Sequence, residues 1–162
     1  MTINIIIAAL VGALSPLPQE YSPEQALVAF EILKDDDLQF GQGASVSRTM
    51  PTEVARLRST AHLETRCGPL FSTTARNLPN GYLVRLEFVS DKIRVSLERH
   101  VPQNFDEEVR ALKKGQCMEV TPLDRIVFAA SFVIDAETND AKREVELGDG
   151  YKLRYISSID SR

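Results

Sequence analysis

The clearest pattern of apolar and polar positions lies in residues 81–101, GYLVRLEFVSDKIRVSLERHV. Apolar and polar residues alternate through residues 82–88 and again through residues 93–97, on either side of Ser90-Asp91. Alternation with a period of two across a short turn predicts two antiparallel strands that bury one face. The opposite row mixes acids with bases, which is typical of a solvated sheet face. We therefore expect this hairpin to organise the core.

Two segments carry helix signals. Residues 23–34 follow Ser22, which can cap a helix, and their apolar residues Ala26, Leu27, Phe30 and Leu33 are spaced to form one helical stripe. Residues 104–114 also have the signals of a helix: Asn104 can cap it, acids lie in the first turn, lysines lie in the last turn, and Gly115 can end it. The apolar face of this second helix should pack on the sheet.

Strands are predicted for most of the remaining chain. Residues 61–67, 117–120 and 151–155 alternate or restart as strands, and the NLPNG sequence before the hairpin predicts a loop. Residues 121–135 fit a helical face as well as a β-rich meander, and the β-rich composition favours strands. The sequence thus predicts an α+β domain over residues 16–162, with a mostly antiparallel sheet of about five to seven strands and two packed helices.

The first residues resemble a signal peptide. Residues 3–14, INIIIAALVGAL, have the length of a signal-peptide apolar region and are too short to span a bilayer of about 30 Å as a helix. We expect a signal peptide over residues 1–15 and a periplasmic or secreted protein. The alternative is an N-terminal strand in a cytoplasmic protein, because Met1-Thr2 carries no Lys or Arg.

Net charge narrows the range of partners. The chain has a formal net charge of −4 and a pI near 5.3, so it has no general electrostatic attraction to nucleic acid or to an anionic membrane. We expect no nucleic-acid partner and no membrane span after signal cleavage. The sequence does not indicate an oligomeric state.

The two cysteines, Cys67 and Cys117, each follow or begin a predicted strand. An even number of cysteines in an exported chain predicts a disulfide, and the long loop that it closes would contribute roughly 4 kcal/mol of loop-closure entropy. A catalytic Cys67 with His62 or His100 is disfavoured, because the bridge uses the same sulfur and His62 would point to the opposite face of the strand.

No motif predicts catalysis, a metal or a cofactor. The Asp35-Asp36-Asp37 run lacks the alternating ligands of a calcium loop and is interpreted as a solvated turn. Two histidines without companion ligands make a zinc site improbable. Glu87 and Glu98 could form a carboxylate pair, but both face basic neighbours on the predicted outer side of the hairpin.

Positive charge gathers locally in Arg56, Arg58, Arg66 and Arg76. This group is a possible surface for an anionic partner, and exposed arginines spread over strands and loops are the alternative. We predict a non-catalytic binding, inhibitory or assembly-accessory protein with an unidentified macromolecular partner. The alternative is an enzyme with a dispersed site that uses the Arg56–Arg76 region to bind an anionic substrate.

Overall fold

The computed structural model describes residues 25–138 and 141–160, which fold almost entirely as antiparallel β-sheet. Two four-stranded sheets have the orders β2-β1-β8-β7 and β3-β4-β5-β6. The elements are β1 (Gln25–Lys34), β2 (Asp37–Ser47), β3 (Thr52–Arg66), β4 (Ser72–Val89), β5 (Lys92–Gln103), α1 (Asp106–Arg110), β6 (Leu123–Asp135), β7 (Arg143–Gly148) and β8 (Tyr151–Asp160).

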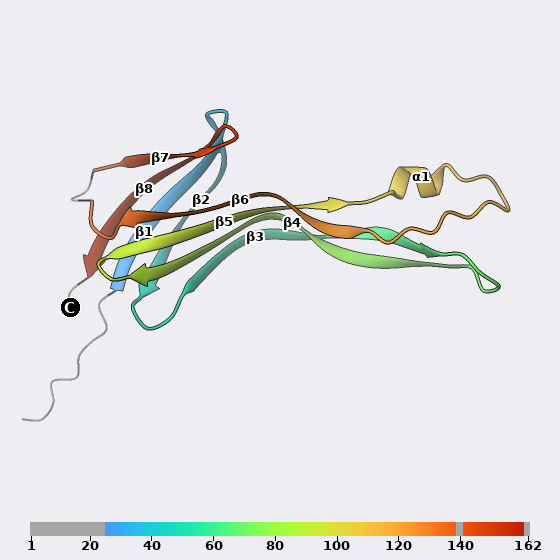
Figure 1. The fold of residues 1–162 in the computed structure, drawn as a ribbon, viewed down its shortest axis with the longest axis horizontal. Coiled ribbons are helices and arrows are strands. Elements are labelled where there is room, and N and C mark those ends of the chain that lie inside the picture. The colour runs from blue at the N-terminus through green and yellow to red at the C-terminus, as the bar shows by residue number, and fades with distance from the viewer. Residues whose placement is uncertain (1–24, 139–140, 161–162) are drawn as a thin grey trace, which may run out of the picture.

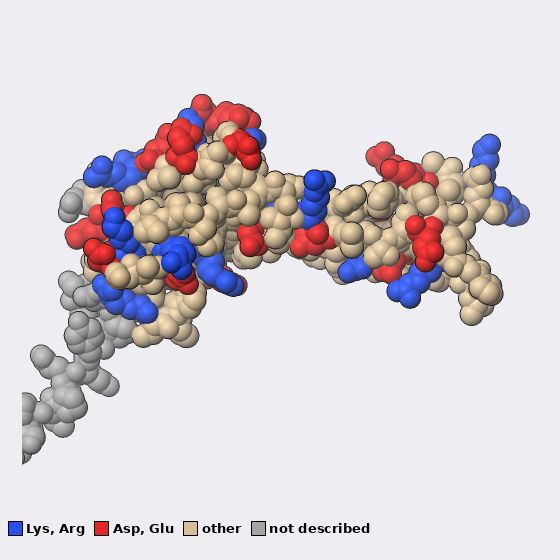
Figure 2. Space-filling view, in the orientation of Figure 1, with Lys and Arg blue, Asp and Glu red and all other residues tan. Residues whose placement is uncertain are grey.

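The molecule has two parts, which we call the body and the arm. In the body the two sheets pack face to face, and β3 to β6 then continue past the first sheet as a narrow extension that ends near α1 (Figure 1). The arm comprises residues 58–80 and 100–126. The space-filling view shows the same narrow extension (Figure 2). Strand β4 runs nine residues from Gly81 back to Ser72, so the arm is about 30 Å long at the usual rise per residue.

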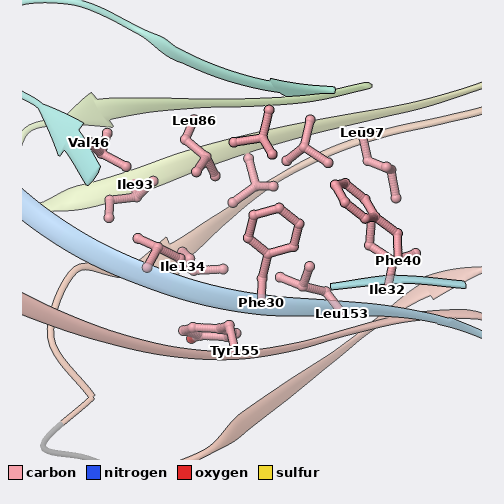
Figure 3. Packing of buried hydrophobic residues seen from close by; sticks show 14 of the residues in the cluster. Phe30, Ile32, Phe40, Val46, Leu86, Ile93, Leu97, Ile134, Leu153 and Tyr155 are labelled. Atoms are coloured by element: carbon pink, nitrogen blue, oxygen red, sulfur yellow. The ribbon is translucent and has the colours of Figure 1, made fainter. Parts of the chain in front are cut away.

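The core of the body lies between the two sheets. Side chains from β1, β2 and β8 meet those from β4, β5 and β6 (Figure 3). Ile32, Leu153, Leu86, Ile93 and Leu97 are almost fully buried there. The predicted 81–101 hairpin is confirmed, with Val89 opposite Lys92 across the Ser90-Asp91 turn and its apolar row inward.

The prediction of an α+β fold with two packed helices is wrong, because residues 25–34 form strand β1. Ala26, Val28, Phe30 and Ile32 alternate with outward residues and are buried. Leu27, which the helical stripe required on the inside, is 52% exposed. The same sequence fits both periods, and pairing with β2 and β8 on either side selects the strand.

The second predicted helix is reduced to the five residues of α1, none of them buried. The predicted end signals do not bound this helix. Asn104 accepts a hydrogen bond from the Asp106 N–H, but the N-cap is Phe105, which has no side-chain cap hydrogen bond, and the helix ends at Ala111, before the left-handed Gly115. Helices gain most of their stability from a buried apolar face. Val109 and Leu112 are only half-buried at the far end of the arm, so the helix does not continue.

Other predictions have mixed outcomes. Residues 123–135 form a strand as favoured, and residues 151–155 lie in β8 with Tyr151, Leu153 and Tyr155 inward. The predicted loop at residues 77–81 is wrong, because these residues continue strand β4. The predicted signal peptide at residues 1–15 lies outside the described residues.

Body and arm meet where β4 has a glycine with an unusual backbone angle and the pairing of β5 with β6 contains a bulge. Gly81 of β4 has a φ of 149°, and a Cβ at this position would lie 1.9 Å from the carbonyl oxygen of Arg56. Opposite Gly81, the pairing of β5 with β6 shifts by one residue between Arg99 and His100. The Arg99 guanidinium lies over the Tyr82 ring and donates to the Gly81 carbonyl. A close backbone approach and a bulge thus redirect the strands into the arm.

Candidate functional site at the end of the arm

A hollow of about 540 Å³ lies on the body and is lined by parts of β1, β2 and β8 together with Arg56 and Lys142. Glu31 stands among its cations: one carboxylate oxygen is 2.9 Å from Lys142 Nζ and 3.6 Å from Arg154. The hydrogen bond from Lys142 holds the pKa of Glu31 below its usual range. Arg56 donates to the Gln39 carbonyl. The charges of this hollow therefore already have partners within the chain.

His62 joins β3 to α1 in the arm. Its Nδ1 is 2.9 Å from Asp106 Oδ2, and its Nε2 is 3.0 Å from the Thr60 hydroxyl. The backbone N–H of Leu63 donates to Asp106 Oδ1, and this bond, followed by the His62 contact, lowers the pKa of Asp106. Both side chains are nearly buried, at 12% and 13% exposed. The group pins the first residue of α1 to β3.

This carboxylate–imidazole–hydroxyl order is that of a catalytic triad. The Thr60 hydroxyl, however, also lies 3.4 Å from the Leu78 carbonyl of the paired strand. A nucleophile must face a space where a substrate can sit near oxyanion donors. The hollow on the body and the hollow at the end of the arm are both lined by other residues. The arrangement therefore supports a structural role.

His100 holds a second polar cluster near the junction. Its Nδ1 is 2.9 Å from Asp124 and its Nε2 is 3.1 Å from Glu98, and its side chain is 10% exposed. The two carboxylates contact opposite nitrogens of one ring, so they cannot bind one ion together with it. Among residues 25–138 and 141–160, no group of three or more His, Cys, Asp or Glu side chains is arranged to hold a metal ion.

The end of the arm is closed by the predicted disulfide between Cys67 and Cys117. Their Cα atoms are 6.0 Å apart, and the bridge joins the β3–β4 turn to the segment that follows α1. Next to it, Thr65 and Val120 exchange both backbone hydrogen bonds, each at 3.0 Å. These contacts hold two turns side by side, residues 67–71 and residues 111–117, which together we call the tip.

The tip exposes two large apolar side chains. Leu70 is 89% exposed and Phe71 is 62% exposed. Phe71 also borders a hollow of about 340 Å³ whose other wall includes Gly115 and Gln116. Lys113 and Lys114 are exposed on the neighbouring turn, and Figure 2 shows basic side chains at the upper corner and an uncharged projection at the lower corner of this end of the molecule. Adjacent apolar side chains held out by a covalent bridge are typical of a binding surface.

The four arginines of the predicted anionic-partner surface lie along the β3–β4 hairpin. Arg56 is at the hollow of the body, whereas Arg66 is the last residue of β3 before the tip, about 33 Å away for ten strand residues. Arg76 lies opposite His62, and Arg58 lies opposite Asn80. Arg66 contacts Glu64. The structure spreads these residues over the body and the arm and does not bring them together.

Sequence reasoning missed Leu70 and Phe71. The available signal was local: a Gly-Pro turn directly after Cys67 is followed by two large apolar residues. The two carboxylates that were considered for a pair have separate partners, since Glu87 contacts Arg94 and Glu98 contacts His100.

Comparisons with protein families, curated proteins and solved structures find no match to this chain. Within the part of the chain that the structure describes, no helix has the length and apolar character needed to cross a membrane.

Proposed function

We propose that this chain is an exported, non-catalytic binding protein that contacts a macromolecular partner through the tip of its arm. The observation that carries the proposal is the exposure of Leu70 and Phe71 on turns joined by the Cys67–Cys117 bridge. Exposed aromatic and aliphatic residues lose little conformational freedom on binding when their backbone is already fixed. A disulfide is also compatible with an oxidising compartment outside the cytoplasm.

The chemistry of the tip favours a protein partner with an apolar pocket and acidic groups at its edge. Leu70 and Phe71 would enter the pocket, and Lys113 and Lys114 would face the acids. An anionic membrane is a less favourable target, because the chain carries a net charge of −4.

The test compares two double variants in a pull-down from extracts of the cells that make the protein. Leu70→Asp with Phe71→Asp changes the tip, whereas Leu38→Asp with Met50→Asp makes the same change at residues of the body that are 64% and 69% exposed. We expect the tip variant to lose the captured partner by at least about tenfold, while the body variant keeps it. Equal capture by both, or binding of the wild type to anionic vesicles, would contradict the proposal.

The enzyme alternative has one supporting observation, the Arg56 side chain in the hollow of the body. An anionic substrate there would have to compete with Glu31 for Lys142 and Arg154. Its test is turnover of phosphorylated or carboxylated small molecules by the wild type and by Arg56→Ala. Turnover that Arg56→Ala abolishes and that the tip variant retains would favour this alternative.

A further inference from the structure

Among residues 25–138 and 141–160, β5 is the only ladder partner of β6, which leaves the outer edge of β6 unpaired. Residues 126–134 read IVFAASFVI, nine residues without a charge. Natural proteins protect such edges with charges, prolines or short strands. The other edge strand of this sheet, β3, carries Glu53, Arg56 and Arg58. The β6 edge has no comparable protection.

The surface of β6 is also apolar. Of the ten large apolar side chains that are exposed among the described residues, four belong to this strand: Leu123, Ile126, Val127 and Val133, each 47% to 53% exposed. Apolar residues concentrated on one unpaired strand indicate a surface that another strand covers.

The order of residues in β6 indicates what that strand is. The sequence reads nearly the same in both directions about Ala130: Phe128 and Phe132 are equidistant from it, and so are Val127 and Val133. Ala129 and Ser131 are similar small residues. In an antiparallel pair centred on Ala130, each residue would therefore lie opposite its equivalent.

The faces of the strand match as well. Phe128 and Phe132 both point to the core side, where Phe128 is buried and Phe132 packs against the core cluster. Ala129 and Ser131 are both exposed on the outer side. Within residues 127–133, residues at equal distances from the centre thus share a face, which a continuous sheet requires.

Opposite charges stand at the two ends of this segment. Arg125 precedes it and Asp135 follows it at the same distance from Ala130. Arg125 has no ion-pair partner among the described residues, and Asp135 is 3.6 Å from Lys92 with more than half of its side chain exposed. In the antiparallel arrangement, Arg125 of one copy and Asp135 of the other come to the same end of the interface, twice per pair.

We propose that β6 pairs with β6 of a second copy, antiparallel about a two-fold axis at Ala130, to form a dimer. The two four-stranded sheets would join into one of eight strands. The bulge at Val127, where the β5 pairing skips a residue, limits the regular ladder to about seven residues on each strand. The two arms would then point in opposite directions, because the paired strands do.

The test uses charges placed on the exposed side of the centre, with the full chain measured by sedimentation at several concentrations. Ala129→Lys with Ser131→Lys places lysine opposite lysine twice, and Ala129→Glu with Ser131→Glu does the same with carboxylates. We expect each variant to weaken the dimer by at least about tenfold. Mixing the two should restore it as a heterodimer.

Register and fold have their own controls. Ala129→Lys with Ser131→Glu places opposite charges together only when Ala130 is the centre of the pairing. This variant should therefore still dimerise. If the centre of the pairing moved by one residue, lysine would lie opposite lysine or glutamate opposite glutamate. Ser59→Lys with Ala61→Lys makes the same change on the outer strand β3, where both residues are exposed, and should leave the dimer unchanged. Thermal melts verify folding of every variant.

Three outcomes would overturn the proposal. The first is a wild type that stays monomeric up to about 100 μM, a concentration at which even a weak dimer with a small interface should form. The second is a dimer that the two like-charged variants do not weaken. The third is a monomer in which those amides of residues 127–133 that point away from β5 are protected from hydrogen exchange, which would mean that another segment of the same chain covers the edge.

Discussion

In the body, β4 and β5 bury a continuous apolar row against the other sheet, whereas in the arm no sheet formed by the described residues covers the same two strands. The body row is Tyr82, Val84, Leu86, Ile93, Val95 and Leu97, each at most 7% exposed. The arm has instead Leu78, Val120, a disulfide and two histidine–carboxylate groups. One sheet is therefore stabilised by apolar burial at one end and by covalent and polar contacts at the other.

This difference follows from how much apolar surface each part can remove from water. A sandwich buries both inner faces, which contributes about 25 cal/mol per Å² of apolar surface. A narrow extension buries little, and small folds of this kind usually need a covalent bridge. We therefore expect the body to resist changes that loosen the arm, and the junction at Gly81 to affect both.

The largest expected effect is that of Gly81→Ala. The added Cβ would meet the Arg56 carbonyl at 1.9 Å, at a φ that side chains rarely adopt. Because β3 and β4 cannot separate without losing the junction, we expect a loss of about 4 kcal/mol or more in the free energy of unfolding. Urea denaturation measures it. Gly43→Ala is the control, since no atom lies within 4 Å of that Cβ, and it should change stability by less than about 1 kcal/mol.

Loss of the disulfide should destabilise the arm and leave the body folded. Cys67 and Cys117 are 50 residues apart, so loop closure contributes at most about 4 kcal/mol. Cys67→Ser with Cys117→Ser should expose the amides of residues 60–66 to hydrogen exchange while the amides of β1 and β8 stay protected. Uniform loss of protection in both parts would show that body and arm unfold as one unit.

Two buried leucines allow a direct comparison of the parts. Leu97 is 1% exposed in the body and Leu78 is 5% exposed in the arm. Leu97→Ala leaves a cavity between two sheets and should cost about 3 kcal/mol. Around Leu78, neighbouring side chains can move into the space that Leu78→Ala leaves, because one side of the strand is not covered. We therefore expect about half of the loss in the free energy of unfolding, with faster hydrogen exchange confined to the arm. Equal losses in urea denaturation would contradict the difference between the parts.

The sequence predicted the body better than the arm for the same physical reason. Alternation in residues 82–88 and 93–97 reflects burial of one face, and burial of that kind is visible in the order of residues. Residues 25–34 were misassigned because their apolar positions fit two periods, and only their neighbours β2 and β8 decide between them. The sequence also indicated the Cys67–Cys117 pairing, because the chain has only these two cysteines.

The arm and its tip depend on contacts that no local pattern encodes. Pro79 and Gly81 are turn signals, yet their pairing with β3 keeps them in a strand. Asp106 appeared as an ordinary acid in the first turn of a helix, and only the fold brings it to His62 and Leu63. The exposure of Leu70 and Phe71 likewise follows from their position on a turn that projects beyond any covering element.

The smallest expected effect concerns Asp106, which fixes α1 to β3. The hydrogen bond from the Leu63 N–H, with that of His62, lowers the pKa of this carboxyl in the folded chain. Its contribution to stability is therefore complete above the unfolded value of about 4 and is lost as the pH falls through the lower folded value. Asp106→Asn should cost about 1–2 kcal/mol at pH 7 and should reduce the extra loss of stability below about pH 4.

Because α1 lies far from the body, this change should accelerate hydrogen exchange at Leu63 and Val109 and leave β1 and β8 unaffected. An equal acceleration in β1 would mean that α1 docking is coupled to the sandwich, and the separation between body and arm would then have to be abandoned.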